Sequence, residues 1–254
     1  MPFCVVKSRT IKIICAFILV AVLLCVSYQG GASALVWFGN SSRRVPIYNV
    51  DTEKKQVAIS FDAAWGADKT EEIIDVLKEY NAKATFFLVG FWVDKYPEKV
   101  KVIDGAGLEI GTHSNTHPDM AKLSEESVRA ELSTSMEKIS AITGKEVRVF
   151  RPPFGSYNNT LLNVCDSLSL KAIQWDVDSL DWKGLSAGEI CKRVMNKAKN
   201  GSIILMHNNA DHVVEATRLT LDWLRKAGYE ITSVGELIYW QDYSIDVNGM
   251  QHEK

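Results

Sequence analysis

Short apolar runs alternate with helix-length segments along most of this 254-residue chain. The runs have the length of buried strands and occupy residues 56–62, 83–89, 108–113, 147–153, 171–179, 201–208 and 229–234. Strand and helix alternating in this way predict a parallel sheet whose strands are joined by crossover helices. Two architectures satisfy this order, a (β/α) barrel and an open doubly wound sheet, and both place functional groups at the carboxyl ends of the strands.

The clearest helix is expected between Ser124 and Gly144. Apolar residues recur there at helical spacing: Val128, Leu132, Met136, Ile139 and Ile142. Ser124 can cap the start of this helix and Gly144 its end. Residues 70–81 and 211–228 show the same pattern, so we expect helices there as well.

The amino-terminal segment predicts export. Lys7, Arg9 and Lys12 precede an uncharged apolar run at 13–26, and small residues follow at 32–34. This order is typical of a signal peptide. The run is shorter than the ~20 residues that comfortably span a bilayer, so residues 1–34 are either a cleaved signal peptide or a retained membrane anchor. Both alternatives place the rest of the chain on the extracytoplasmic side, at the membrane or in the cell wall.

Beyond the leader we expect a lead-in segment at 35–55, one domain at 56–240 and a tail at 241–254. The formal net charge of −2 offers no basic surface for nucleic acid. Cys165 and Cys191 are the two cysteines beyond the leader, and their spacing matches no metal motif. We interpret them as small core residues, with a disulfide as the alternative.

Polar residues that are unusual for a sheet interior follow five of the predicted strands. They are Asp62, His113, Arg151, Asp178 and His207. A lone acid at a strand end usually caps the next helix. Because the carboxyl ends of parallel strands meet at one edge, five such side chains together predict an active site.

His113 and His117 form a candidate metal-binding pair. If their loop coils into a helical turn, both imidazoles project from one face, roughly 5–6 Å apart at Cβ. Neutral imidazole is a good ligand for zinc, iron, cobalt or nickel.

The remaining strand ends suggest acid–base chemistry. Arg151 precedes two prolines that fix the backbone, and its guanidinium could orient a carboxylate through a bidentate contact. His207 ends an apolar run, where a buried histidine needs a carboxylate partner and would then act as a general acid. The stretch at 176–182 offers three acids, followed by Trp182 as a pocket wall: Asp176, Asp178 and Asp181. Alternation along a strand puts Asp176 and Asp178 on one face.

Five stretches, in order, resemble the five motifs of the polysaccharide deacetylase family (the NodB-homology domain): SFDAAWG, HSNTH, RPPFGSYN, DSLDW and LMH. The resemblance covers about residues 55 to 238, and the leader and the FDAAWG variant look most like the sporulation-associated PdaB type of endospore formers. It implies a distorted (β/α) barrel of seven or eight strands. It also implies hydrolysis of N-acetyl groups on peptidoglycan or a related amino-sugar polymer, with a bound divalent metal, zinc or else cobalt, nickel or iron.

The resemblance also implies roles for individual residues. His113 and His117 would be metal ligands, Asp62 the general base and His207 the general acid. Asp178 would orient His207, and Arg151 would hold Asp62. The acetyl pocket would be lined by four further residues, which are Trp182, Leu205, Pro153 and Phe154.

One position departs from the family pattern. Aligned without gaps, the Asp that serves as third metal ligand falls on Ala63, which cannot ligate a metal, whereas catalytic zinc sites usually have three protein ligands. Asp62 could turn to the metal, or Asp68 could reach in, although Asp68 lies at the start of the next helix. The alternatives to a working deacetylase are a glycan-binding protein with weak or absent metal binding and little turnover, and a hydrolase of another C–N bond, such as a cyclic amide.

Overall fold

The structure, a computed structural model, describes residues 43–254. The expected leader at 1–34 lies outside the described residues. Within the described part, all strand pairs of the main sheet are parallel, and seven strands follow the order β6-β5-β4-β3-β2-β8-β7, with β9 pairing β2 beyond this path. The strands are β2 (Gln56–Ala63), β3 (Thr85–Leu88), β4 (Glu109–Thr112), β5 (Val149–Phe150), β6 (Lys171–Ala172), β7 (Val177–Asp178), β8 (Ile203–His207) and β9 (Glu230–Thr232).

The sheet curls into an incomplete (β/α) barrel, which confirms the expected distorted barrel and excludes the open doubly wound sheet. Its end strands β6 and β7 do not pair with each other in the described part of the chain. The lead-in segment lies between them instead: Ile47 forms a parallel bridge with Ile173, and Asn49 forms an antiparallel bridge with Ser202. Part of the segment expected to precede the domain therefore fills the opening of the barrel.

The single strand expected at 171–179 is divided into β6 and β7. Between them, the backbone of Gln174 bonds to the Ile47 carbonyl at 2.7 Å. The Asp176 carboxylate then accepts hydrogen bonds from Ser202 Oγ at 2.9 Å and from the Ile203 backbone N–H at 2.9 Å. These contacts fix Asp176 to the start of β8, so it does not share a functional face with Asp178 as alternation had predicted.

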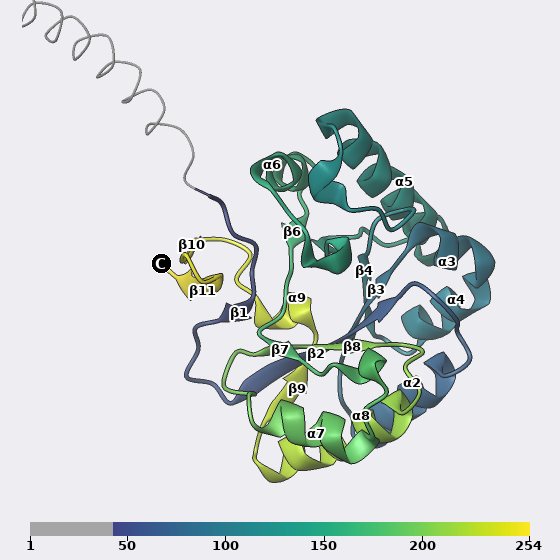
Figure 1. Cartoon of the computed structure of the whole chain (residues 1–254), viewed down its shortest axis with the longest axis vertical. Helices are drawn as coiled ribbons and strands as arrows, with labels where there is room; N and C mark the ends of the chain where they lie inside the picture. Colours follow the sequence, from purple (N-terminus) through teal and green to yellow (C-terminus); the bar gives the residue numbers. More distant parts are fainter. Residues whose placement is uncertain (1–42) are drawn as a thin grey trace, which may run out of the picture. The chain divides into compact units, whose positions relative to one another are not determined.

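Helices form an outer layer around the strands (Figure 1). They are α2 (Thr70–Glu79), α3 (Gly90–Lys95), α4 (Pro97–Gly105), α5 (Glu125–Thr143), α6 (Asn159–Ser167), α7 (Ala187–Met195) and α8 (Val213–Lys226). The short α9 (Val234–Leu237) is not part of this layer, because its Val234 and Leu237 belong to the smaller of the two core clusters. The caps predicted for α5 are confirmed: Ser124 Oγ accepts a hydrogen bond from the Ser127 N–H, and Gly144 ends the helix with φ of 68°. None of the helices within residues 43–254 is long and apolar enough to cross a bilayer.

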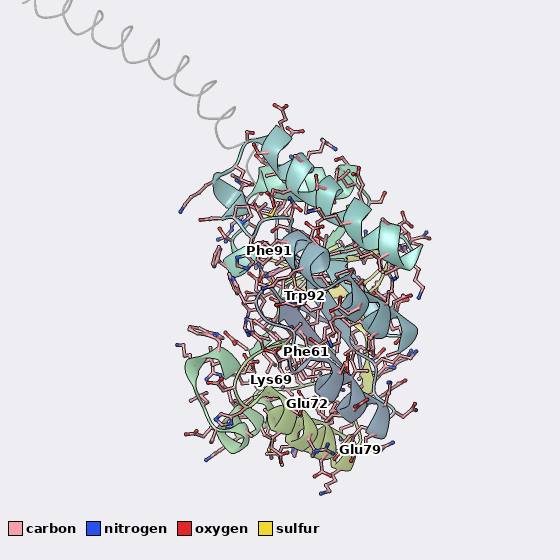
Figure 2. All side chains as sticks on the ribbon, turned by 90° about the vertical axis from the view of Figure 1, so that its right-hand side faces the viewer. Phe61, Lys69, Glu72, Glu79, Phe91 and Trp92 are labelled. Carbon is pink, nitrogen blue, oxygen red and sulfur yellow. The ribbon has the colours of Figure 1, made fainter. Side chains whose placement is uncertain are left out.

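Alternation along β2 separates two apolar regions and so determines where Asp62 points. Val57, Ile59 and Phe61 pack against the helices, in the larger core cluster. Ala58 belongs to the smaller cluster inside the barrel, and Asp62 lies on that same inner face. Figure 2 shows Phe61 and Trp92 in the interior, whereas Glu79 lies at the margin of the molecule, as the exposed face of α2 requires.

A small second sheet joins the two ends of the described chain. It contains β1 (Asn49–Val50), which is parallel to β11 (Met250–Glu253), and β10 (Tyr243–Ile245), which is antiparallel to β11. Residues expected to form a carboxyl-terminal tail therefore pair with the lead-in segment, and the chain ends beside these strands (Figure 1). Cys165 and Cys191 are buried free thiols, which agrees with their interpretation as core residues.

Candidate active site

A cavity of about 540 Å³ lies at the carboxyl ends of the barrel strands. Four of the five strand-end residues line it, as their positions predicted: Asp62, His113, Asp178 and His207. The fifth, Arg151, is fully buried behind the cavity wall and reaches it through Asp62. The parallel topology therefore brings together residues that are up to 145 positions apart in the sequence.

Asp62 is held as a carboxylate by Arg151. Arg151 Nη1 donates to Asp62 Oδ1 at 2.8 Å, while Nη2 donates to the Gln174 carbonyl at 3.1 Å. The contact is thus a single hydrogen bond rather than the expected bidentate pair. Burial alone would raise the pKa of Asp62, but the charges of Arg151 and the nearby histidines outweigh it and hold this pKa below its usual value. Asp62 is therefore ionised at neutral pH.

The guanidinium of Arg151 lies near two aromatic rings. Its Cζ lies 4.2 Å from the centroid of the Phe87 ring and 5.6 Å from that of the Trp175 ring. Phe87 is the register partner of Asp62 on the neighbouring strand. The Asp62 carboxylate is consequently oriented by a buried cation that has two aromatic rings close to it.

Asp181, and not Asp178, orients His207. Asp181 Oδ1 lies 2.8 Å from His207 Nδ1, and Asp181 Oδ2 accepts the His207 backbone N–H at 2.7 Å. The expectation that Asp178 would have this role is wrong. Asp178 Oδ1 accepts the Leu180 N–H instead, and Leu180 adopts a left-handed conformation with φ of 54° that turns the chain so that Asp181 lies beside His207.

The environment of His207 favours its protonated form. Burial lowers the pKa of this imidazole, but the hydrogen bond and charge of Asp181, together with the charges of Asp62 and Asp178, outweigh burial and raise it. Asp178 lines the cavity and contributes through its charge. The raised pKa increases the protonated fraction of His207, and Nε2 is the nitrogen left to donate a proton, since Nδ1 is bonded to Asp181.

His113 is neutral, and its tautomer follows from its partner. Its Nδ1 lies 2.7 Å from the Arg151 carbonyl oxygen, which can only accept, so Nδ1 carries the proton. Nε2 therefore presents a lone pair toward the cavity, 3.6 Å from Asp62 Oδ2. Burial, only partly offset by Asp62, lowers the pKa of His113 to about 4.

His113 and His117 lie close together, but not on a helical turn. Their ring centroids are 5.0 Å apart. Ser114 and His117 have positive φ values of 71° and 60°, and Ser114 Oγ accepts the His117 N–H at 3.0 Å. Glu131 closes the loop by accepting from the backbone N–H groups of Asn115 and Thr116, both at 2.8 Å. The prediction that the two imidazoles lie close together is confirmed, but a loop with two left-handed residues brings them together rather than a helical turn.

The donor set does not fit a metal centre with three protein ligands. Ala63 is fully buried in the apolar core and offers only a methyl group. Asp62 is already bonded to Arg151, and Asp68 is exposed and does not line the cavity. Among residues 43–254, no group of three or more His, Cys, Asp or Glu side chains is placed to hold a metal ion.

Aromatic and apolar side chains form the rest of the cavity wall. Trp182, Leu205 and Phe154 line it, as the resemblance implied. Pro153 does not, and its neighbour Pro152 takes that place. The difference arises because residues 153–155 form a tight turn with Phe154 at φ of 59°, which leaves Pro153 buried and Phe154 exposed.

Comparisons with known proteins agree with this geometry. The sequence profile of the family described as "Polysaccharide deacetylase" matches residues 49–173. A peptidoglycan-N-acetylglucosamine deacetylase of Bacillus cereus is 31% identical over 199 residues, which cover 76% of this chain and 93% of that protein. The peptidoglycan-N-acetylmuramic acid deacetylase PdaC of Bacillus subtilis is 33% identical over 188 residues, which cover 74% of this chain and 40% of that protein.

Two similar solved structures are of a pseudoenzyme, one of the wild type and one of a mutant with restored activity. A wild-type CE4-family pseudoenzyme from Bacillus anthracis has a TM-score of 0.74 and 34% identity, covering 83% of this chain and 73% of that chain. A mutant of that pseudoenzyme with restored enzymatic activity is 37% identical to this chain, with the same TM-score, covering 76% of this chain and 71% of that chain.

Several other curated relatives are longer, and this chain spans only 40–60% of their length. Profile, relatives and structures nevertheless agree on the same domain. The chain belongs to the polysaccharide deacetylase family.

Proposed function

We propose that this chain hydrolyses N-acetyl groups of peptidoglycan or a related amino-sugar polymer. The observation that carries the proposal is the presence of two hydrogen-bonded pairs at one cavity, Arg151–Asp62 and Asp181–His207. The first supplies an ionised carboxylate and the second an imidazole whose pKa is raised. Asp62 and His207 are register partners on the adjacent strands β2 and β8, and a general base and a general acid that face one cavity are what amide hydrolysis requires.

The residues suggest how the reaction would proceed. Asp62 takes a proton from a water molecule, whose oxygen attacks the carbonyl carbon of the acetamide. His207 then gives its Nε2 proton to the nitrogen as the C–N bond breaks, which yields acetate and a free amine. Arg151 and Asp181 are positioning residues, because they hold the direction and the charge of Asp62 and His207. A metal would polarise the carbonyl, but no step here is assigned to one, because the donor set lacks its third ligand.

The cavity suits an amino-sugar unit. Its volume of about 540 Å³ lies within the range of roughly 300–1,000 Å³ that is usual for small-ligand sites. One relative is named for N-acetylglucosamine and another for N-acetylmuramic acid. Both sugars carry the acetamide group that the two pairs would act on, so we propose the N-acetylated glycan as the partner class.

We further propose that the chain is exported and that it acts in the spore envelope. Export is supported by the basic start, the apolar run and the small residues within positions 1–34. The link to sporulation is supported by the resemblance of the leader and the FDAAWG stretch to the PdaB type.

A second candidate function is glycan binding with little turnover. Ala63 favours it, because the imidazole pair has no third ligand. The pseudoenzyme of Bacillus anthracis shows that the family includes members described as inactive. Metal held weakly by His113 and His117 alone would fit this alternative.

One experiment separates the two candidates. Acetate release and glycan binding are measured with an acetylated chitooligosaccharide and with muropeptides, for the wild type and for Asp62→Asn. Asp68→Asn is the matched control, because Asp68 is an exposed acid outside the cavity. The proposal predicts acetate release by the wild type and by the control but not by Asp62→Asn. Glycan binding without acetate release by the wild type would contradict hydrolysis and support the binding role.

A further inference from the structure

We propose that Trp65 is a stacking platform for the sugar ring next to the one whose acetamide is hydrolysed. This inference rests on the proposed function and extends it to a second subsite. The general family pattern has proline where this chain has Trp65, so the roles that the resemblance implies for individual residues do not include this position. The structure gives four separate supports.

The first support is the distribution of exposed aromatic residues. In the described part of the chain, the exposed large apolar side chains include three aromatic ones, which are Trp65, Phe154 and Trp182. All three line the same cavity. Exposed apolar groups that gather around a cavity mark a binding surface, whereas scattered ones carry no such meaning.

The second support is that the backbone forces Trp65 outward. The Gly66 carbonyl accepts hydrogen bonds from Trp92 Nε1 at 2.7 Å and from Asn208 Nδ2 at 3.0 Å. Both donor residues are fully buried. Gly66 has φ of 68°, which favours glycine, and a Cβ there would meet the Asn209 side chain at 3.2 Å. The turn is therefore anchored on the residue after Trp65, and 60% of Trp65 remains exposed.

The third support is the arrangement around His117. The Trp65 ring meets His117 edge-on, with centroids 5.0 Å apart, and Phe154 meets His117 in the same way at 4.8 Å. The Phe91 ring centroid lies 6.4 Å from that of Trp65, with the two rings tilted by 48°. These contacts restrict the orientation of the Trp65 ring, while 60% of the residue remains exposed and available to a ligand.

The fourth support is continuity with the reacting centre. Trp65 is three residues beyond Asp62, and Ala64 between them lines the cavity with only a methyl group. A polymer whose acetamide reaches Asp62 must therefore continue over the cavity rim. A pyranose has an apolar face of C–H bonds and a rim of hydroxyls, which matches a half-exposed indole better than a flat apolar peptide would.

Ligand length provides the test. Binding of N-acetylglucosamine and of its dimer, chitobiose, is measured by calorimetry for the wild type, Trp65→Ala and Trp65→Phe. We expect the wild type to bind the dimer about tenfold more tightly than the monomer, the scale of one aromatic contact. Trp65→Ala should reduce this ratio to about one, and Trp65→Phe should retain most of it, because a ring is still present.

Two further variants make the result specific. Trp182→Ala should weaken the binding of monomer and dimer alike, since Trp182 lines the wall of the cavity that takes the reacting sugar. Val247→Ala removes an exposed apolar side chain in the turn between β10 and β11, and it should change neither affinity. A Trp65→Ala variant that keeps the wild-type ratio overturns the platform. Length-dependent binding through Trp65 without acetate release overturns only the proposed hydrolysis, and a wild type that binds neither the monomer nor the dimer overturns both.

Discussion

The two halves of the cavity differ in how completely they are built. The acid–base half contains Asp62 and His207, each hydrogen-bonded to its own partner, Arg151 or Asp181. The imidazole half contains His113 and His117, which lie close together but lack a third ligand, because Ala63 stands where the family has an acid. Residues of both halves line the same cavity, so the missing third ligand is not a consequence of local misfolding.

The two halves therefore differ in what the fold requires of them. The fold depends on the hydrogen-bonded pairs of the acid–base half but not on a third ligand in the imidazole half. Arg151 and Asp181 are buried charged groups, and each would cost stability if its partner were lost. Ala63 is an apolar residue in an apolar cluster and costs nothing there. An alanine in place of a metal ligand thus leaves the stability of the fold intact, whereas the loss of a member of either hydrogen-bonded pair lowers it.

Removing Arg151 should have the largest effect. Arg151→Met leaves the Asp62 carboxylate buried without its cation, which should lower the free energy of unfolding by about 3–5 kcal/mol. Urea denaturation measures this change. The matched control is Arg218→Met, which breaks an ion pair with Glu79 whose side chains are 38% and 55% exposed and should cost less than ~1 kcal/mol. Equal losses for the two variants would contradict the structural role of the acid–base half.

Asp181→Asn should come next and should act on the pH profile as well as the rate. His207 is active when protonated, so acetate release is lost as the pH rises through its raised pKa. Removing the charge of Asp181 lowers that pKa, and the alkaline limb should move to lower pH. We expect acetate release to fall by about 100-fold at its optimum, within the range for general-acid catalysis.

Asp178→Asn is the control for this variant. Asp178 influences His207 through charge alone, so its removal should shift the alkaline limb less than Asp181→Asn does. A larger shift for Asp178→Asn would restore the role that the family resemblance first implied for that residue.

Ala63→Asp should complete the imidazole half, with the smallest effect of the three. Ala63 is the last residue of β2, and the family resemblance implies that a carboxylate at this position would complete the ligand set of His113 and His117. We expect zinc affinity to rise by at least about tenfold, the scale of a change in a metal's ligand environment. The gain is measured by zinc titration and should be opposed by the cost of a carboxylate in an apolar cluster. Ala64→Asp, which adds the same charge on the cavity wall, should give a smaller gain; an equal one would mean that position 63 has no special role.

Much of the fold was accessible from the sequence because its signals are local. The apolar runs and the caps of α5 depend on neighbouring residues, and they predicted most of the strands of the main sheet and helices α2, α5 and α8. The pairing of β1 with β11 could not be predicted, since it joins residues 200 positions apart without a distinctive pattern. The filling of the barrel opening by Ile47 depends on the same kind of long-range contact.

The site was predicted in its location but not in all its contacts. Parallel topology alone brings Asp62, His113 and His207 to one cavity. Which acid contacts His207 depends on the backbone at Leu180, a left-handed residue that is not glycine and so gives no signal in the sequence. The family resemblance implied Asp178 for this contact, whereas the structure places Asp181, from the same short stretch, beside His207.

Acetate release by two variants, one from each half, tests the account most directly. We compare Asp62→Asn with His117→Ala, using an acetylated chitooligosaccharide and the wild type as reference. Hydrolysis by the acid–base half predicts a loss of about 1,000-fold for Asp62→Asn, within the usual range for such catalysis, and a loss of less than about tenfold for His117→Ala. Equal and large losses for both variants would show that the two halves act as one unit, and would contradict the account.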